Sequence, residues 1–143
     1  MVKYAPIMKM TTKGKYAVSA MCELACAYAN DGGKYLQAKD IASRHFLSEL
    51  YVEQILNMLK RSNLVKAIRG PHGGYSLVRP PKKIKIGDIL EATEGPISLV
   101  HCITKSGSDT CKLSLKCKTK KFWSKLNNVI QGVLDETTLE DLC

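Results

Sequence analysis

The chain has 143 residues, with 22 lysines or arginines against 13 acidic residues and a formal net charge of +9. This length suits one domain with a real hydrophobic core and excludes two large ones. No apolar run approaches the roughly 18 residues that a membrane helix needs, and residues 4–10 are too few and too interrupted for a signal peptide. We therefore expect a cytoplasmic protein, in which the six cysteines serve metal or redox chemistry rather than a structural disulfide framework.

The positive charge is concentrated in the N-terminal half. Residues 1–85 hold fifteen basic and five acidic residues, whereas residues 135–143 are acidic. This distribution indicates a polyanionic partner for the first half. A generic basic surface is the alternative that charge alone leaves open.

A helix from Lys13 to Asn30 is predicted after a loose arm at residues 1–10. Thr11 or Thr12 caps it, and residues 31–33 stop it. Cys22 and Cys26 lie four residues apart in this helix and are interpreted as core residues, with a two-thiol site as the alternative. Apolar residues at helical spacing predict one buried face, namely Ala17, Met21, Leu24, Ala25 and Tyr28.

A helix-turn-helix and a hairpin are predicted next. One helix runs from Leu36 to Arg44, and Ser48 caps a second helix that ends near Arg61. Residues 64–69 and 75–79 flank a Gly/Pro turn and predict two paired strands. This order is typical of a winged helix, so the expected fold is mainly α with a small β-wing. The buried stripe of the second helix comprises Val52, Ile55, Leu56 and Leu59.

The C-terminal part begins with a short helix at residues 84–93 that Gly95 and Pro96 end. Residues 101–118 predict a loop, and Thr119 to Leu134 predict an amphipathic helix whose apolar face needs a cover. Intramolecular packing would serve, but a two-fold partner is favoured. Thr137 and Glu140 predict a capping box for a last turn. The apolar face comprises Phe122, Leu126, Val129, Ile130 and Val133.

These elements divide the chain into four parts. We expect residues 1–81 to form a winged helix-turn-helix DNA-binding region and residues 82–100 to form a connecting helix. We expect residues 101–118 to form a cysteine-bearing sensor loop and residues 119–143 to form a dimerisation helix with a C-terminal tail.

A winged helix with a basic surface favours a double-stranded DNA operator as partner, with a protein-interaction module as the alternative. Gln54 suits adenine and Glu53 suits a cytosine amino group, whereas Ser48 and Tyr51 suit phosphate. Side chains at the turn of the wing are expected to reach the minor groove or the backbone. The candidate DNA-binding residues are Lys39, Ser48, Tyr51, Glu53, Gln54, Arg69 and His72.

Cys102, Cys111 and Cys117 lie in the predicted loop with the spacing Cys-x8-Cys-x5-Cys. Three thiolates suit a [4Fe–4S] cluster with one open place, whereas a [2Fe–2S] cluster needs another ligand. Thiol oxidation and zinc are the alternatives. The lysines of this stretch are expected to lower the pKa values of the thiols. Candidates for a fourth ligand are His101, Asp109 and Cys143.

No enzymatic activity is expected. The chain has no phosphate-binding loop, no paired carboxylates and no nucleophile–base set, because His45, His72 and His101 are scattered.

Several motifs together resemble the Rrf-type family of bacterial winged-helix transcription regulators. They cover nearly the whole chain after residue 10 and comprise Thr11–Ala17, Leu50–Gln54, Leu64–Tyr75 with its Arg-Gly-Pro-x-Gly-Gly-Tyr turn, Leu90–Pro96 and Thr137–Leu142. The resemblance implies a homodimeric repressor whose long C-terminal helices cross at the dimer interface. It also implies that the DNA-contact region contains Ser48, Tyr51, Glu53, Gln54 and Arg69.

Cluster-binding members of that family carry three cysteines before the long helix, and Cys102, Cys111 and Cys117 match these places. The familiar fourth ligands are absent, because Lys120 stands where IscR-like members have a histidine and Lys15 where NsrR-like members have an acid. The resemblance implies a regulator that senses iron–sulfur status, redox or nitric oxide through an iron–sulfur cluster. The alternative is a cluster-free, CymR-like regulator of cysteine and sulfur metabolism, which acts by thiol oxidation or by binding a cysteine-synthesis enzyme.

Overall fold

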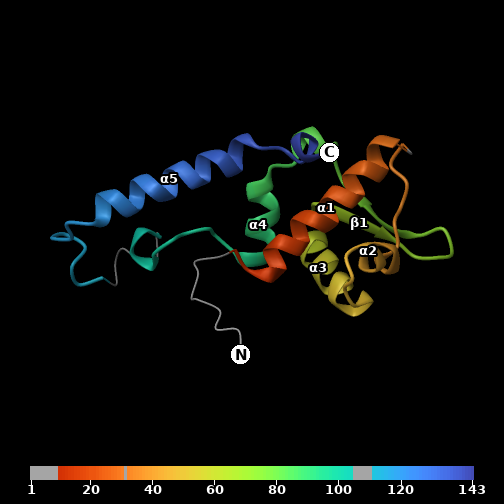
Figure 1. Ribbon diagram of the computed structural model, residues 1–143, viewed down its shortest axis with the longest axis horizontal. Helices are drawn as coiled ribbons and strands as arrows, with labels where there is room; N and C mark the ends of the chain where they lie inside the picture. Colours follow the sequence, from red (N-terminus) through yellow and green to blue (C-terminus); the bar gives the residue numbers. More distant parts are fainter. Residues whose placement is uncertain (1–9, 31, 105–110) are drawn as a thin grey trace, which may run out of the picture.

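The computed structural model describes residues 10–30, 32–104 and 111–143. The predicted N-terminal arm except Met10, Asp31 and the candidate ligand Asp109 lie outside the described residues. The predicted elements are confirmed in order and type, with ends that shift by at most two residues (Figure 1). They are α1 (Thr12–Asn30), α2 (Ala38–Arg44), α3 (Glu49–Arg61), β1 (Val65–Ile68), β2 (Gly74–Leu77), α4 (Ile86–Glu94) and α5 (Lys120–Glu136), with short 3₁₀ turns η1 (Pro81–Lys83), η2 (His101–Ile103) and η3 (Leu139–Leu142).

Helix α1 lies at the centre of the winged helix and packs against α3, α4, β2 and η3. Thr11 caps it, since its Oγ1 accepts a hydrogen bond from the Gly14 amide at 3.2 Å. Gly14 allows a close approach to α4, because a Cβ there would lie 3.2 Å from Leu90 Cδ2. The predicted buried face is confirmed for four residues that are at most 1% exposed, Ala17, Met21, Leu24 and Ala25, and Tyr28 packs half-buried at its edge.

The wing is attached to the segment before α2. Strands β1 and β2 are antiparallel, with Val65 opposite Leu77. Leu36 and Tyr75 exchange two backbone hydrogen bonds of 2.9 and 2.7 Å, so the segment before α2 adds to the edge of the hairpin. Gly74 permits this approach: its φ is +138°, and a Cβ there would lie 2.3 Å from the Leu36 carbonyl oxygen. The wing is therefore fixed relative to the helix-turn-helix.

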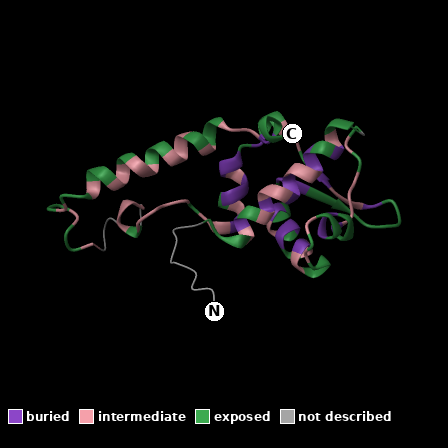
Figure 2. Ribbon diagram, in the orientation of Figure 1, coloured by how far each residue is buried: buried purple, intermediate pink, exposed green. Residues whose placement is uncertain are grey.

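Helix α5 projects from the winged helix and packs against α4 and η2 (Figure 1). None of its residues is buried, whereas the buried residues cluster in the winged helix (Figure 2). In the described part of the chain, no helix has the length and apolarity to cross a membrane.

The chain returns to the winged helix after α5. Leu139 is fully buried, and its amide donates to the Ile84 carbonyl at 2.8 Å. The predicted capping box at Thr137 and Glu140 is wrong by one residue: Thr138 is the cap, and its amide donates to Asp141 Oδ2 at 2.8 Å. The reason is that Thr137 still serves α5, since its hydroxyl donates to the Val133 carbonyl at 2.7 Å.

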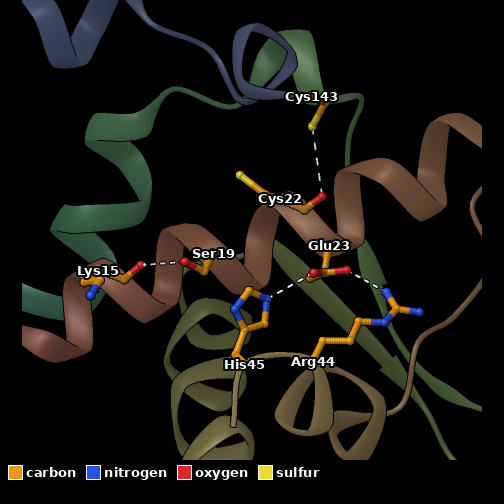
Figure 3. Close-up of polar contacts among 7 residues, drawn as sticks. All are labelled: Lys15, Ser19, Cys22, Glu23, Arg44, His45 and Cys143. Atoms are coloured by element: carbon orange, nitrogen blue, oxygen red, sulfur yellow. Dashed lines mark hydrogen bonds and ion pairs between the residues drawn. The ribbon is translucent and has the colours of Figure 1, made fainter. Parts of the chain in front are cut away.

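A polar contact joins α1 to the end of α2 (Figure 3). Glu23 accepts from Arg44 Nη1 at 2.5 Å and lies 3.0 Å from His45 Nε2. Burial alone would raise the pKa of Glu23, but the hydrogen bonds from Arg44 and His45 outweigh it and hold that pKa below its usual value. Ionised Glu23 therefore stabilises the position of α2 against α1.

We expect Glu23→Gln to lower the free energy of unfolding by about 1 kcal/mol at pH 7. Because the folded-state pKa of Glu23 is depressed, its contribution is present above the unfolded-state pKa and is lost as pH falls through the folded-state value. The difference between Glu23→Gln and the unaltered protein should therefore shrink towards pH 3 in urea titrations. The exposed Glu91→Gln is the control; a pH-independent difference for Glu23→Gln would contradict the assignment.

Candidate DNA-reading surface and cysteine loop

Helix α3 buries one face and presents the other to solvent, as expected. Its predicted buried stripe is at most 1% exposed, and Gln54 on the opposite side is exposed. Ser48 is the N-cap, and its Oγ accepts from the Tyr51 amide at 3.2 Å. The exposed start of α3 is therefore a rigid helix end with polar side chains, which is the form that enters a major groove.

Tyr51 and Glu53 are half-buried beside neighbouring elements. The Tyr51 ring meets the Tyr16 ring edge-on at 6.2 Å between centroids, so α1 orients it. Burial, and then the charge of Glu53, raise the pKa of Tyr75, which places Glu53 near the wing. Among the residues that the structure describes, Glu53 has no ion-pair partner.

The turn of the wing carries Arg69 and His72, both exposed. The Gly73 amide donates to the Gly70 carbonyl at 3.0 Å and closes the turn. Gln37, just before α2, donates to the Pro71 carbonyl at 3.5 Å. The turn is thus connected to the segment that leads into the helix-turn-helix.

Exposed basic residues surround the start of α3 and the wing. The sequence interpretation included Lys39 and Arg69 but missed Lys34 and Lys66. Lys66 is exposed on β1, in which only Val65 is buried, and its Nζ lies 5.9 Å from the centre of the Tyr35 ring. No local pattern in the sequence marks Lys66 or Lys34. The exposed basic residues around the start of α3 and the wing are Lys34, Lys39, Lys66 and Arg69. Lys60 and Arg61 are also exposed, but they lie in the last turn of α3, at the other end of that helix.

The loop cysteines lie at the end of the molecule that α5 reaches. Cys102 lies in η2, which packs against α5, and Cys111 and Cys117 are half-buried in the stretch before α5. Thiolates are the ligands that an iron–sulfur cluster needs. Among the residues that the structure describes, however, no three metal-ligating side chains lie close enough together to hold a metal ion. A bound cluster would therefore need the loop to close around it.

Two candidate fourth ligands are placed by the structure. His101 is exposed beside Cys102. Cys143 is excluded as a ligand within the same chain, because α5 separates it from Cys117 (Figure 1), and a 17-residue helix is roughly 25 Å long.

Cys117 has the environment of a reactive thiol. Its Sγ lies 3.4 Å from Thr119 Oγ1. The pKa of Cys117 is lowered, first by hydrogen bonds with Thr119 and then, to a smaller extent, by the backbone and charge of Lys120. The expected lowering of the thiol pKa is confirmed for Cys117, but its main cause is a hydrogen bond with Thr119 rather than the charge of the lysines. An open cavity of about 760 Å³ is lined by Cys117 and by Lys120, Lys121 and Lys125 of α5.

Cys22 and Cys26 differ from the core residues that the sequence predicts. Cys22 is half-buried and packs on the core, but Cys26 is exposed. The prediction is wrong for Cys26 because α1 buries only the arc facing α3 and α4, and Cys26 lies outside that arc.

Comparison with known proteins places the whole winged helix and α5 in one family. The family model Rrf2, described as an iron-dependent transcriptional regulator, matches residues 10–143. The HTH-type transcriptional regulator CymR of Bacillus subtilis is 39% identical over 135 residues, which are 94% of this chain and 89% of that protein. The regulator IscR of Cereibacter sphaeroides is 33% identical over 135 residues, 94% and 86% of the two chains.

Comparison with solved structures finds the same relatives. CymR, the global cysteine regulator of B. subtilis, superposes with a TM-score of 0.76 at 38% identity, covering 95% of this chain and 96% of that one. IscR of T. potens gives a TM-score of 0.74 at 37% identity, with coverages of 94% and 85%. The fold, the exposed face of α3 and these relatives together show that the chain belongs to the Rrf2 family of winged-helix, DNA-binding transcription regulators and is not an enzyme.

Proposed function

We propose that this chain is a homodimeric repressor that reads operator DNA with α3 and the wing and binds an iron–sulfur cluster through its cysteine loop. The observation that carries the DNA-reading part is the exposed polar end of α3 beside a fixed wing, with exposed basic residues around both. Basic side chains neutralise phosphates, whereas the polar residues of the helix end distinguish bases.

Within this surface, Gln54 pairs with adenine and Glu53 accepts from a cytosine amino group. Ser48, Tyr51 and Lys39 contact phosphates, and Arg69 and His72 of the wing lie along the minor groove or backbone.

We expect Gln54→Ala to weaken binding to its best site about 10-fold and to relax the preference for one base pair. Sites are selected from random duplex DNA with the unaltered protein, and affinities are measured by fluorescence anisotropy at several salt concentrations. Arg69→Ala should weaken all sequences alike and reduce the salt dependence. The matched control is Gln131→Ala on α5; equal losses for Gln54→Ala and Gln131→Ala would refute the proposed reading face.

Homodimerisation is supported by the apolar stripe of α5. Phe122 is 56% exposed, and Val129 and Val133 are each 59% exposed, although they share one side of the helix. The opposite side is already used, since Asn127 Oδ1 accepts from the Leu99 amide at 3.3 Å. An isologous second copy of α5 would cover the stripe by burying like against like.

We expect Val129→Asp to convert the protein from a dimer to a monomer of 15.8 kDa, because it places a charge in the apolar contact. Light scattering after size-exclusion chromatography measures the mass. Asn128→Asp adds the same charge next to the stripe and should leave the dimer intact. A monomeric unaltered protein at tens of micromolar would remove this part of the proposal.

Cluster binding is supported by the three cysteines of the loop, and by the similarity to IscR and to a family described as iron-dependent. Cys102, Cys111 and Cys117 would hold a [2Fe–2S] or [4Fe–4S] cluster as thiolates, and the lowered pKa of Cys117 favours that form. The cluster would supply sensitivity to oxygen, nitric oxide or iron supply. Because η2 packs against α5 and Cys117 precedes it, these cysteines would fix the loop to the start of the dimer helix.

We expect anaerobically purified protein to be brown and to contain iron and sulfide, and Cys111→Ala to lose the visible absorbance. Cys22→Ala, which changes a cysteine outside the loop, should keep it. A colourless, iron-free protein would instead favour the second candidate, a cluster-free regulator of cysteine metabolism that responds by thiol oxidation or binds a cysteine-synthesis enzyme. The similarity to CymR in sequence and fold supports that candidate.

A further inference from the structure

The three cysteines outside the loop gather at one place. Cys22 and Cys26 lie one turn apart on α1, and η3 brings Cys143 against them. The Cys143 thiol donates to the Leu139 carbonyl at 3.4 Å and approaches the Cys22 carbonyl oxygen at 4.0 Å (Figure 3). Residues 121 positions apart in sequence are thus in contact.

The position of Cys143 follows from the packing of η3. Leu139 is fully buried, and its amide bonds to the Ile84 carbonyl. Thr138 and Asp141 close the turn through two hydrogen bonds of 2.8 and 2.9 Å. These contacts fix the backbone that leads to Cys143. The Cys143 thiol is therefore held at one position beside α1.

Cys26, rather than Cys22, is the partner available to Cys143. Cys26 and Cys143 are exposed and line the same open cavity of about 630 Å³, between α1, η1 and η3. Cys22 is half-buried, and its thiol points away from Cys143 (Figure 3). An oxidant in solution therefore reaches Cys26 and Cys143 together.

We propose that Cys26 and Cys143 form a reversible disulfide that joins α1 of the DNA-reading domain to the segment after α5. With a peroxide as oxidant, the Cys26 sulfur attacks one peroxide oxygen, the O–O bond breaks, and one water leaves. The resulting sulfenic acid is attacked by the Cys143 sulfur, the S–S bond forms, and a second water leaves. Both thiol protons end in the two waters, and a dithiol reductant reverses the reaction.

The electrostatics of the site fit this order of steps. Burial, then the nearby Cys26 thiol, which also hydrogen-bonds with Cys143, raise the pKa of Cys143 to about 11. Cys143 therefore stays protonated at neutral pH and is a poor first target, since the thiolate is the nucleophile. Oxidation of Cys26 to a neutral sulfenic acid removes the Cys26 thiolate charge that helps to raise the pKa of Cys143. Cys143 is then more easily deprotonated and attacks the sulfenic acid in the second step.

The bond would join α1 to the segment that follows α5. Residues 26 and 143 close a loop that contains the wing, α4 and α5, so the disulfide removes much of the freedom of the unfolded chain. It also holds the end of α5 to the DNA-reading domain. This device uses none of the loop cysteines and is independent of cluster binding.

The test uses the full chain with Cys102, Cys111 and Cys117 each replaced by serine, so that failure of cluster binding cannot affect it. After hydrogen peroxide treatment, we expect the mass to fall by two hydrogens, and alkylation should then label only one of the three remaining thiols. Digestion with trypsin and a glutamate-specific protease, which cuts after Glu23, separates Cys22 from Cys26 and should yield a Cys26–Cys143 cross-link. The melting temperature should rise by roughly 10 °C and return on reduction.

Adding Cys22→Ser should leave the cross-link and the shift in melting temperature unchanged. Adding Cys26→Ser or Cys143→Ser should abolish both, and circular dichroism checks that these exposed substitutions leave the fold intact. The proposal is overturned by a Cys22–Cys26 disulfide, by a disulfide between two chains, or by thiols that stay reduced under peroxide that oxidises the urea-unfolded chain.

Discussion

The close packing of α1 against its neighbours is the constraint on which the rest of the molecule depends. Small residues on its buried face let α3, α4 and β2 approach one helix, and Gly14 leaves room for Leu90 where α4 crosses. α3 receives its orientation from this contact, and Glu23 holds the end of α2 through Arg44 and His45. The candidate DNA-reading helix α3 is therefore positioned by a helix that carries none of the candidate DNA-binding residues.

Helix α5 has a different character. It contributes no buried residue to the winged helix, and its two sides serve different purposes. One side meets α4 and η2, and the other exposes Phe122, Val129 and Val133. Its N-terminal end carries the cysteine loop and its C-terminal end leads to Cys143, so two separate groups of thiols lie at opposite ends of one rod (Figure 1).

Local patterns predicted most of the fold, because helical spacing, caps and Gly/Pro turns act over a few residues. The stripe of α3, the Ser48 cap and the hairpin were recovered for that reason. The docking of η3 was not predicted, since nothing near Leu139 tells that Ile84 is its neighbour. For the candidate site, residue type and spacing identified the exposed end of α3, but the exposure of Cys26 depends on which arc of α1 its neighbours leave open.

The burial of Leu139 also has a consequence for folding during synthesis on the ribosome. Helices α1, α3 and α4 and the wing emerge early, but the pocket beside Ile84 stays empty until residue 139 has left the exit tunnel. The nascent winged helix therefore waits, incompletely packed, while α5 is synthesised. A complete winged helix and a complete α5 consequently arise together, and a product truncated before Leu139 would lack a complete core.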